Sequence, residues 1–222
     1  MRMRRKKHLT ERLNSVSDYI IVADKKFTNV KEALEYKRLI DFSKVFNNDN
    51  KVCLEIGCGK GRFICETAKK FSNLNFLAVE LLENIIVTAS EKAKKENLSN
   101  VRFLNTGVEY LLRYIPEGSI DKIFLNFSPP YPAKSYENRR FTNDRNIASY
   151  KKMLNNCGEI YQKTDDKEFF LYSKEKLSDG GFTVLDISDC YLKNEYINVK
   201  TEYEEKFLNN NIKINALVAK KN

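Results

Sequence analysis

The chain has 222 residues, and 39 Lys and Arg against 30 Asp and Glu give it a formal net charge of +9. This length allows one sizeable α/β domain, and no internal repeat or long Pro/Gly/Ser linker divides the sequence. The positive charge favours a polyanionic partner. No apolar run follows the basic N-terminus as in a signal peptide, and no stretch approaches the roughly 20 apolar residues of a bilayer span. We therefore expect a cytoplasmic protein with no membrane segment.

Basic residues are concentrated at two places along the chain. Arg139, Arg140 and Arg145 cluster in the second half, and a basic N-terminal arm covers residues 1–28. Such residues contact nucleic-acid phosphates, but a charged terminus is as often a solvated end, and both interpretations stay open for the arm. Its first dozen positions contain Arg2, Arg4, Arg5, Lys6, Lys7 and Arg12.

The cysteines predict neither disulfides nor a metal site. They form no Cys-x-x-Cys pair, they are odd in number, and the sequence contains one histidine. Cys53 and Cys157 lie in predicted strands and are expected in the core. Cys58 is either a reactive thiol or a small packed side chain, and packing is the preferred interpretation. The remaining cysteines are Cys65 and Cys190.

The first predicted helix follows the arm. Asn29 or Thr28 can cap its N-terminus, and the apolar pattern extends it to about Phe42 as a lid or packing helix. Its apolar stripe would consist of Ala33, Leu34, Tyr36, Leu39 and Ile40.

A strand over residues 52–56 leads into a glycine-rich turn and a helix over residues 62–71, whose Phe63, Ile64 and Ala68 should face the sheet. The turn reads Gly-x-Gly-x-Gly, which differs from the Gly-x-Gly-x-x-Gly of dinucleotide-binding enzymes. Glu55 lies at the end of the strand, where a carboxylate would repel a phosphate and attract a cation. S-adenosylmethionine carries both a sulfonium and an ammonium group, so this cofactor fits the turn better than a dinucleotide does.

A second acid follows the next strand. Residues 75–80 form this strand and end in Glu80. Ligands of parallel α/β sheets bind outside the carboxyl ends of the strands, so Glu55 and Glu80 should face one crevice. A carboxylate at the second position suits the paired hydroxyls of a ribose.

The rest of the chain alternates between helices and strands, as in a parallel α/β sheet with right-handed crossovers. The loop over residues 127–132 contains three prolines, which cannot continue a strand, and we expect it to be a rigid loop at the crevice. The last two strands, over 182–187 and 212–219, can pair antiparallel. Between these landmarks we predict helices over residues 81–96, 108–114, 143–155, 169–177 and 201–208, and strands over 101–104, 121–126 and 159–163.

The combined motifs resemble the bacterial tRNA (guanine-N7-)-methyltransferase family over nearly the whole chain. The glycine turn occurs in many methyltransferases, whereas Lys-Thr-Asp and Thr-Glu-Tyr-Glu at this separation are much more specific. The motifs are LEIGCGKG at 54–61, NFS at 126–128, Arg139-Arg140, GEI at 158–160, KTD at 163–165 and TEYEEKF at 201–207.

The resemblance implies a Rossmann-like class I methyltransferase domain over residues 1–222, with a mostly parallel seven-stranded sheet, helices on both faces and an antiparallel C-terminal strand. It implies S-adenosyl-L-methionine as donor and the variable-loop guanine at tRNA position 46 as acceptor, and it leaves the oligomeric state open between monomer and homodimer. Cofactor contacts are implied at Glu55, Gly57, Gly59, Glu80, Asn105, Gly107, Asn126 and Pro129. Contacts to tRNA are implied at Lys134, Arg139, Arg140, Lys163, Asp165, Thr201, Glu202, Tyr203 and Glu204.

Three positions depart from the family pattern. Gly107 stands where the family usually has an acid after the third strand, so we expect any adenine contact there to come from backbone groups. Pro129 replaces the acid of the usual Asp-Pro-Trp-Pro-Lys loop. Ala133 replaces its lysine, for which Lys134 can substitute.

The chemistry of guanine N7 does not require the acid that the proline loop lacks at Pro129. N7 presents a lone pair, so its attack on a sulfonium methyl group needs no prior deprotonation. The site must position the reactants in line and tolerate a cationic product. Asp165, Glu202 and Glu204 are the candidates for this electrostatic role. Thr201 and Glu204 also fit a helix capping box, which is compatible with substrate contact.

An aromatic side chain can support a base that has left its stack, and Tyr131 or Tyr136 could do so or could wedge the proline loop against the sheet. Two rival functions remain. The sequence Ser128-Pro-Pro-Tyr131 also matches a motif of methyltransferases acting on exocyclic or amide nitrogens of the N6-adenine or glutamine type. Gly107 and Pro129 alternatively indicate a cofactor-binding or tRNA-binding homologue without turnover.

Overall fold

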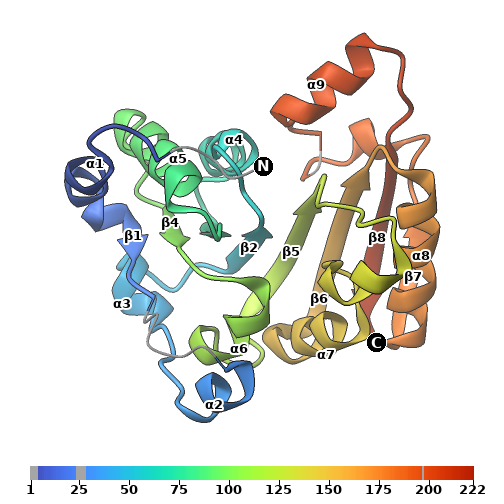
Figure 1. Ribbon diagram of the computed structural model, residues 1–222, viewed down its shortest axis with the longest axis horizontal. Helices are drawn as coiled ribbons and strands as arrows, with labels where there is room; N and C mark the ends of the chain where they lie inside the picture. The colour runs from blue at the N-terminus through green and yellow to red at the C-terminus, as the bar shows by residue number, and fades with distance from the viewer. Residues whose placement is uncertain (1–4, 24–28, 197) are drawn as a thin grey trace.

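The computed structural model describes residues 5–23, 29–196 and 198–222, and its centre is an eight-stranded sheet in the order β1-β4-β3-β2-β5-β6-β8-β7 (Figure 1). All pairs are parallel except those of β8, which runs antiparallel to both β6 and β7. The strands are β1 (Ile20–Ile21), β2 (Val52–Ile56), β3 (Asn75–Val79), β4 (Val101–Leu104), β5 (Ile120–Asn126), β6 (Leu154–Thr164), β7 (Phe182–Asp186) and β8 (Asn215–Lys221).

The α/β class and the antiparallel C-terminal strand are confirmed, but the strand count differs from the expected seven. The additional strand is β1, a two-residue segment of the N-terminal arm that pairs with β4 through Ile20 and Ile21. Two residues are too short to show a periodic pattern, which explains why the sequence did not reveal this strand.

Helices cover both faces of the sheet (Figure 1). One core contains Phe63 and Ile64 of α4 with Ile86 of α5, and the other contains Tyr150 of α7 with Phe170 of α8. Phe63, Ile64 and Ala68 are buried, as predicted. The α-helices are α1 (Leu9–Ser15), α2 (Val30–Glu35), α3 (Phe42–Phe46), α4 (Arg62–Lys70), α5 (Glu83–Lys95), α6 (Leu111–Tyr114), α7 (Asp144–Met153), α8 (Lys167–Asp179) and α9 (Glu202–Asn209).

Short 3-10 helices occupy Ser17–Tyr19, Val108–Tyr110, Lys134–Arg139 and Tyr191–Lys193. None of the helices in the described ranges is long and apolar enough to cross a bilayer.

The predicted helix over residues 29–42 is wrong in its length. Asn29 caps α2 by accepting a hydrogen bond from the N–H of Lys31, but the helix ends at Glu35. The chain then extends along α6, where the N–H groups of Arg38 and Ile40 donate to the carbonyls of Arg113 and Tyr114 at 2.8 Å each. These tertiary hydrogen bonds replace the helical ones, and Tyr36 and Leu39 of the expected stripe are exposed. The alternative cap Thr28 lies outside the described residues.

The described part of the basic arm docks on α5. The Arg12 guanidinium binds both carboxylate oxygens of Glu91, at 2.7 and 2.6 Å, and the N–H of Lys6 donates to Asn84 Oδ1 at 3.0 Å. Arg12 therefore has a structural partner, and it is not available as a free phosphate ligand.

The predicted environment is confirmed for Cys53 and Cys58 and wrong for Cys157. Cys53 is buried, whereas Cys157 is exposed even though it lies in β6. Cys58 is buried, and this burial raises the pKa of its thiol well above the usual value, which suits packing rather than reactivity.

The glycine turn allows α4 to begin immediately after β2 and to pack closely on α5. Gly57, Gly59 and Gly61 all have positive φ, at 78°, 56° and 80°. A Cβ on Gly61 would lie 2.7 Å from the Cβ of Ala89 in α5, so only glycine permits this approach.

This packing predicts the effect of Gly61→Ala on stability. The left-handed backbone should cost about 1–2 kcal/mol with a side chain, and the clash with Ala89 about 1–3 kcal/mol more. Gly118→Ala is the matched control, because Gly118 has φ 69° but no atom within 4 Å of its Cβ position. Urea unfolding should show a clearly larger loss for Gly61→Ala, and equal losses would contradict the packing argument.

Candidate functional site

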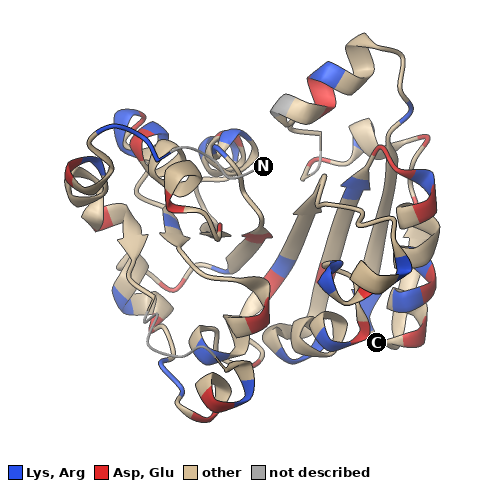
Figure 2. Cartoon of the chain, viewed as in Figure 1, with Lys and Arg blue, Asp and Glu red and all other residues tan. Residues whose placement is uncertain are grey.

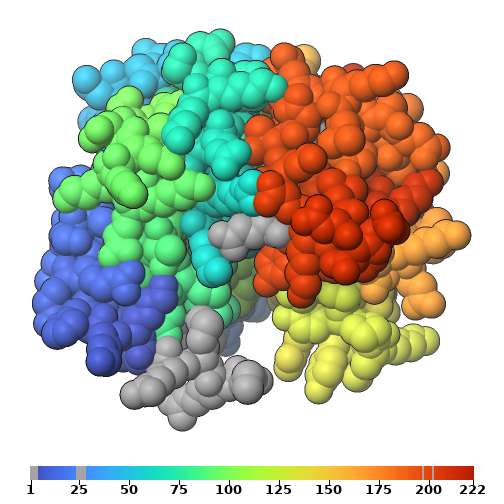
Figure 3. Space-filling view, turned by 90° about the horizontal axis from the view of Figure 1, so that it is seen from above, coloured from blue at the N-terminus to red at the C-terminus, as the bar shows by residue number. Residues whose placement is uncertain are grey.

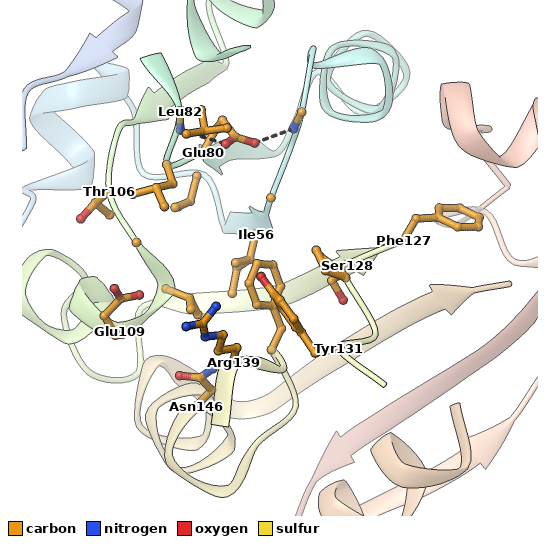
Figure 4. A pocket seen from close by; sticks show the side chains of 18 of the residues that line it. Ile56, Glu80, Leu82, Thr106, Glu109, Phe127, Ser128, Tyr131, Arg139 and Asn146 are labelled. Carbon is orange, nitrogen blue, oxygen red and sulfur yellow. Dashed lines mark hydrogen bonds between the residues drawn. The ribbon is translucent and has the colours of Figure 1, made fainter. Parts of the chain in front are cut away.

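A cavity of about 700 Å³ opens at the carboxyl ends of β2, β3, β4 and β5. Gly57 and Gly59 line it from the glycine turn, Glu80 from the end of β3, and Thr106 to Glu109 from the segment after β4. Figure 4 shows Glu80, Thr106 and Glu109 on one side of this cavity and Ser128 and Tyr131 of the proline loop on the other. Glu80 lines this cavity as expected, but Glu55, which was expected to face the same crevice, does not line it.

A second cavity of about 90 Å³ shares Gly57, Gly59, Phe127 and Tyr203 with the first. Glu55 lines this smaller cavity and is 2% exposed. Its Oε1 accepts a hydrogen bond from Asn126 Nδ2 at 3.0 Å, while Oε2 has no hydrogen-bond partner among the described residues.

Burial raises the pKa of Glu55 to about 7, against the opposing effect of the Asn126 hydrogen bond. A buried acceptor of this kind favours a cationic ligand, since a positive charge would stabilise the ionised carboxylate.

Glu80 is held in place by three neighbouring groups. Its carboxylate accepts hydrogen bonds from the N–H of Leu82 at 2.9 Å and of Gly59 at 3.3 Å. Asn105 donates from Nδ2 to the carbonyls of Glu80 and Leu81 at 2.8 and 2.9 Å. Burial raises the pKa of Glu80. Asn105 therefore positions Glu80 from behind, and it does not line the 700 Å³ cavity.

The proline loop follows β5 and has a strained backbone at both ends. Phe127 and Tyr131 adopt φ values of 50° and 44°, which L-residues rarely adopt. Arg140 holds the loop through hydrogen bonds to the carbonyls of Pro130 at 2.9 Å and Tyr131 at 3.1 Å. The Arg140 side chain, predicted to contact tRNA, therefore also has a structural role in holding the loop.

Two buried acceptors beside the loop lack partners among the described residues. They are Ser128 Oγ, which belongs to a residue lining the larger cavity, and Asn126 Oδ1, whose residue lines the smaller one. The site therefore offers hydrogen-bond acceptors next to the place where the two cavities meet.

Helix α9 stands above the carboxyl ends of β5 and β6 (Figure 1) and lies against α4 when seen from above (Figure 3). Arg62 of α4 binds Glu205 of α9 through two contacts, at 2.6 and 2.5 Å. The ring of Phe127 stacks on Phe207 with 5.7 Å between centroids. These contacts connect the glycine turn and the proline loop to α9.

The predicted capping box at the start of α9 is confirmed, with Thr201 as N-cap and Glu204 as its partner. Glu204 also forms a fully buried ion pair with Lys163 of β6, 2.5 Å between Nζ and Oε2. Burial lowers the pKa of Lys163, and the charge of Glu204 opposes this shift. A pair with no exposed side-chain surface fastens α9 to the sheet, so direct substrate contact by Lys163 or Glu204 does not fit this arrangement.

The other predicted substrate residues are only partly brought together. Arg139 and Tyr203 line the larger cavity, as do Tyr131 and Pro129. Asp165 is partly exposed beyond the end of β6, and Lys134 is exposed at the start of a 3-10 helix, and neither lines the two cavities. The side chain of Glu202 lies outside the described residues.

Sequence reasoning did not identify Glu109 and Arg145, which line the larger cavity. Arg145 belongs to a basic cluster that was noticed for its charge alone. Glu109 sits two residues after Gly107, and only its position in space distinguishes it from a surface glutamate.

Comparison with known proteins matches residues 49–217 to a family described as putative methyltransferase. The tRNA (guanine-N(7)-)-methyltransferase of Geobacillus sp. (strain WCH70) is 37% identical over 208 residues, which cover 93% of this chain and 90% of that relative. The protein of the same name from Clostridioides difficile (strain 630) is 35% identical over 222 residues, covering 100% of this chain and 99% of that relative.

Among solved structures, the 16S rRNA methyltransferase KamB superposes with a TM-score of 0.62 at 11% identity, covering 83% of this chain and 95% of that chain. This likeness shows a shared fold.

The buried pair predicts that Glu204→Gln destabilises the protein. The substitution keeps an acceptor for the capping box but leaves the Lys163 ammonium without its carboxylate, which should cost about 3–5 kcal/mol of unfolding free energy. The double variant Lys163→Met/Glu204→Gln should recover most of this loss.

Glu205→Gln is the control for this measurement, because it breaks the more exposed pair with Arg62, which solvent screens, and should cost much less. Chemical denaturation of the variants measures these differences. A loss for Glu204→Gln no larger than for Glu205→Gln would refute the structural role of the pair.

Proposed function

We propose, because the chain belongs to the tRNA (guanine-N7-)-methyltransferase family, that it transfers a methyl group from S-adenosyl-L-methionine to N7 of a guanine in tRNA. The acceptor is the guanine at position 46 of the variable loop, and the reaction takes place in the cytoplasm, where tRNA is available. The observation that supports this function most directly is the buried Glu55 Oε2 beside the glycine turn, which has no hydrogen-bond partner in the described part of the chain.

The residues of the crevice fit the cofactor. S-adenosyl-L-methionine supplies a methyl group on a cationic sulfur. Glu55 provides a carboxylate for the positively charged end, and burial strengthens that attraction because the local dielectric is low. Glu80 keeps lone pairs available for ribose hydroxyls after accepting from Leu82 and Gly59. Gly57 and Gly59 let the backbone approach the ligand closely.

Guanine N7 needs orientation rather than deprotonation. Its lone pair is free at neutral pH, so Pro129 in place of an acid removes no required general base. The work of the site is to align N7 with the methyl group and to exclude water. Tyr203 lines both cavities and is 62% exposed, which suits an aromatic face for a base displaced from its stack. Asp165 remains a candidate for electrostatic stabilisation from outside the cavities.

The basic residues divide into two groups by their place in the fold. Figure 2 shows Lys and Arg on many of the helices around the sheet, interspersed with acidic residues. Lysines in the last turns of helices complement the helix dipole at the edge opposite the cavity. These are Lys69 and Lys70 in α4, Lys92, Lys94 and Lys95 in α5, and Lys151 and Lys152 in α7.

Arg139 and Arg145 line the larger cavity instead, and we assign the phosphate contacts nearest the reacting base to them.

One observation favours a second candidate, methyl transfer to an exocyclic amino group. Ser128 Oγ and Asn126 Oδ1 are buried acceptors without partners among the described residues, and an amino group would donate to both. Guanine presents N7 and O6 as acceptors on its major-groove edge, so this edge can accept from the Ser128 hydroxyl but offers no donor to Asn126 Oδ1.

A nucleoside digest tests the proposed reaction. Unmodified tRNA incubated with the protein and methyl-labelled cofactor should yield labelled 7-methylguanosine, and a transcript with adenosine at position 46 should yield none. Label in N6-methyladenosine would instead establish the amino-group reaction. Cofactor binding without label in any nucleoside would show an inactive homologue.

The raised pKa of Glu55 predicts a pH-dependent affinity. Above about pH 7 the carboxylate is ionised and attracts the cationic cofactor, whereas below it protonation removes that attraction. Calorimetric titration from pH 8.5 to 5.5 should show affinity falling by up to about tenfold per pH unit on the acid side. Glu55→Gln should bind the cofactor weakly at pH 8.5, and its affinity should not fall further as the pH is lowered. Parallel profiles for the two proteins would show that Glu55 does not contact the cofactor.

A further inference from the structure

The segment after β4 places a carboxylate where position 107 has no side chain. The backbone at Gly107 is extended, with φ −81° and ψ 156°, a conformation open to any residue. A Cβ built on Gly107 would lie 2.5, 2.7 and 2.8 Å from Oε2, Cδ and Oε1 of Glu109. Glycine at 107 is therefore explained by space rather than by backbone geometry, since the Glu109 carboxylate occupies the room that a side chain at 107 would need.

A short 3-10 helix directs Glu109 to this place. The helix spans Val108–Tyr110, and the N–H of Tyr110 donates to the carbonyl of Gly107 at 3.1 Å, which turns the chain back on itself. Glu109 is partly buried, lines the 700 Å³ cavity, and forms no hydrogen bond or ion pair with another described residue. A carboxylate in this state has its full acceptor capacity available to a ligand.

The order of the strands identifies the part of the ligand that reaches Glu109. Strands β2, β3 and β4 are consecutive neighbours in the sheet. Glu55 lies near the end of β2, Glu80 directly follows β3, and Glu109 lies in the segment after β4. With the cationic end of the cofactor at Glu55 and the ribose at Glu80, the adenine extends toward β4. The exocyclic N6 amino group is the hydrogen-bond donor that this base carries.

We infer that Glu109 accepts a hydrogen bond from the adenine amino group and takes the place of the acid that the family usually carries at position 107. This inference rests on the proposed use of S-adenosylmethionine. It replaces the expectation that backbone groups alone contact the adenine. It also makes Glu109 a specificity residue, because a carboxylate repels the carbonyl oxygen that hypoxanthine has in place of the amino group.

Calorimetry with two ligands tests the assignment on the full chain. S-adenosylhomocysteine and S-inosylhomocysteine differ in this amino group, and the unaltered protein should prefer the former by roughly 10- to 100-fold, the range for a hydrogen bond to a charged group. Glu109→Ala should lose most of that preference and bind S-adenosylhomocysteine correspondingly more weakly. Glu117→Ala, an exposed glutamate outside the cavity, is the matched control and should behave like the unaltered protein.

A positional exchange provides a second measurement. Gly107→Asp alone should weaken binding, because its carboxylate would crowd that of Glu109, whereas Gly107→Asp/Glu109→Ala should regain affinity and base preference relative to Glu109→Ala. Thermal melting confirms that each variant is folded. Unchanged affinity and preference in Glu109→Ala would overturn the assignment while leaving the proposed function intact. Failure of the unaltered protein to bind S-adenosylhomocysteine would overturn both.

Discussion

Two hydrogen bonds to one carbonyl hold the site together. The N–H groups of Gly57 and Cys58 both donate to the carbonyl of Val79, at 2.8 and 3.0 Å, and so tie the turn after β2 to the end of β3. Gly59, in the same turn, then donates to the Glu80 carboxylate. Because positive φ values are needed for this path, the glycines serve the connection between two strand ends, and this connection aligns the acids that follow.

The aligned acids place three carboxylates at the site of a molecule that is positively charged overall. The chain carries a net charge of +9, yet Glu55, Glu80 and Glu109 line the two cavities at the edge of the sheet. Burial raises the pKa of Glu55 and of Glu80, so their ionised forms are unfavourable without a compensating charge. Arg139 and Arg145 line the larger cavity together with Glu80 and Glu109. The acids can attract a cationic cofactor, while the two arginines attract the phosphates of a polyanionic RNA.

Local patterns in the sequence were sufficient for the succession of strands and helices along the chain and for the two acids at strand ends. Glu55 and Glu80 follow buried apolar strands, and parallel packing brings such positions to one edge. The helix predicted after Glu35 was wrong because this segment forms hydrogen bonds to α6 instead of helical ones. No local pattern in the sequence indicates such hydrogen bonds to a distant element.

Glu204 shows a similar division between local and distant contacts. Its capping role was readable from Thr201 three residues earlier, but its burial depends on Lys163 in a distant strand. Glu109 was missed because a single turn of 3-10 helix decides where its carboxylate lies.

A crystal structure of the protein with S-adenosylmethionine tests the central claim most directly, namely that the cofactor lies across the ends of β2, β3 and β4. We predict the ammonium and sulfonium end beside Glu55, the ribose hydroxyls within hydrogen-bonding distance of Glu80, about 2.5–3.0 Å between oxygens, and the adenine beside Glu109. A cofactor bound in the reverse direction, or outside the two adjoining cavities, would contradict this prediction.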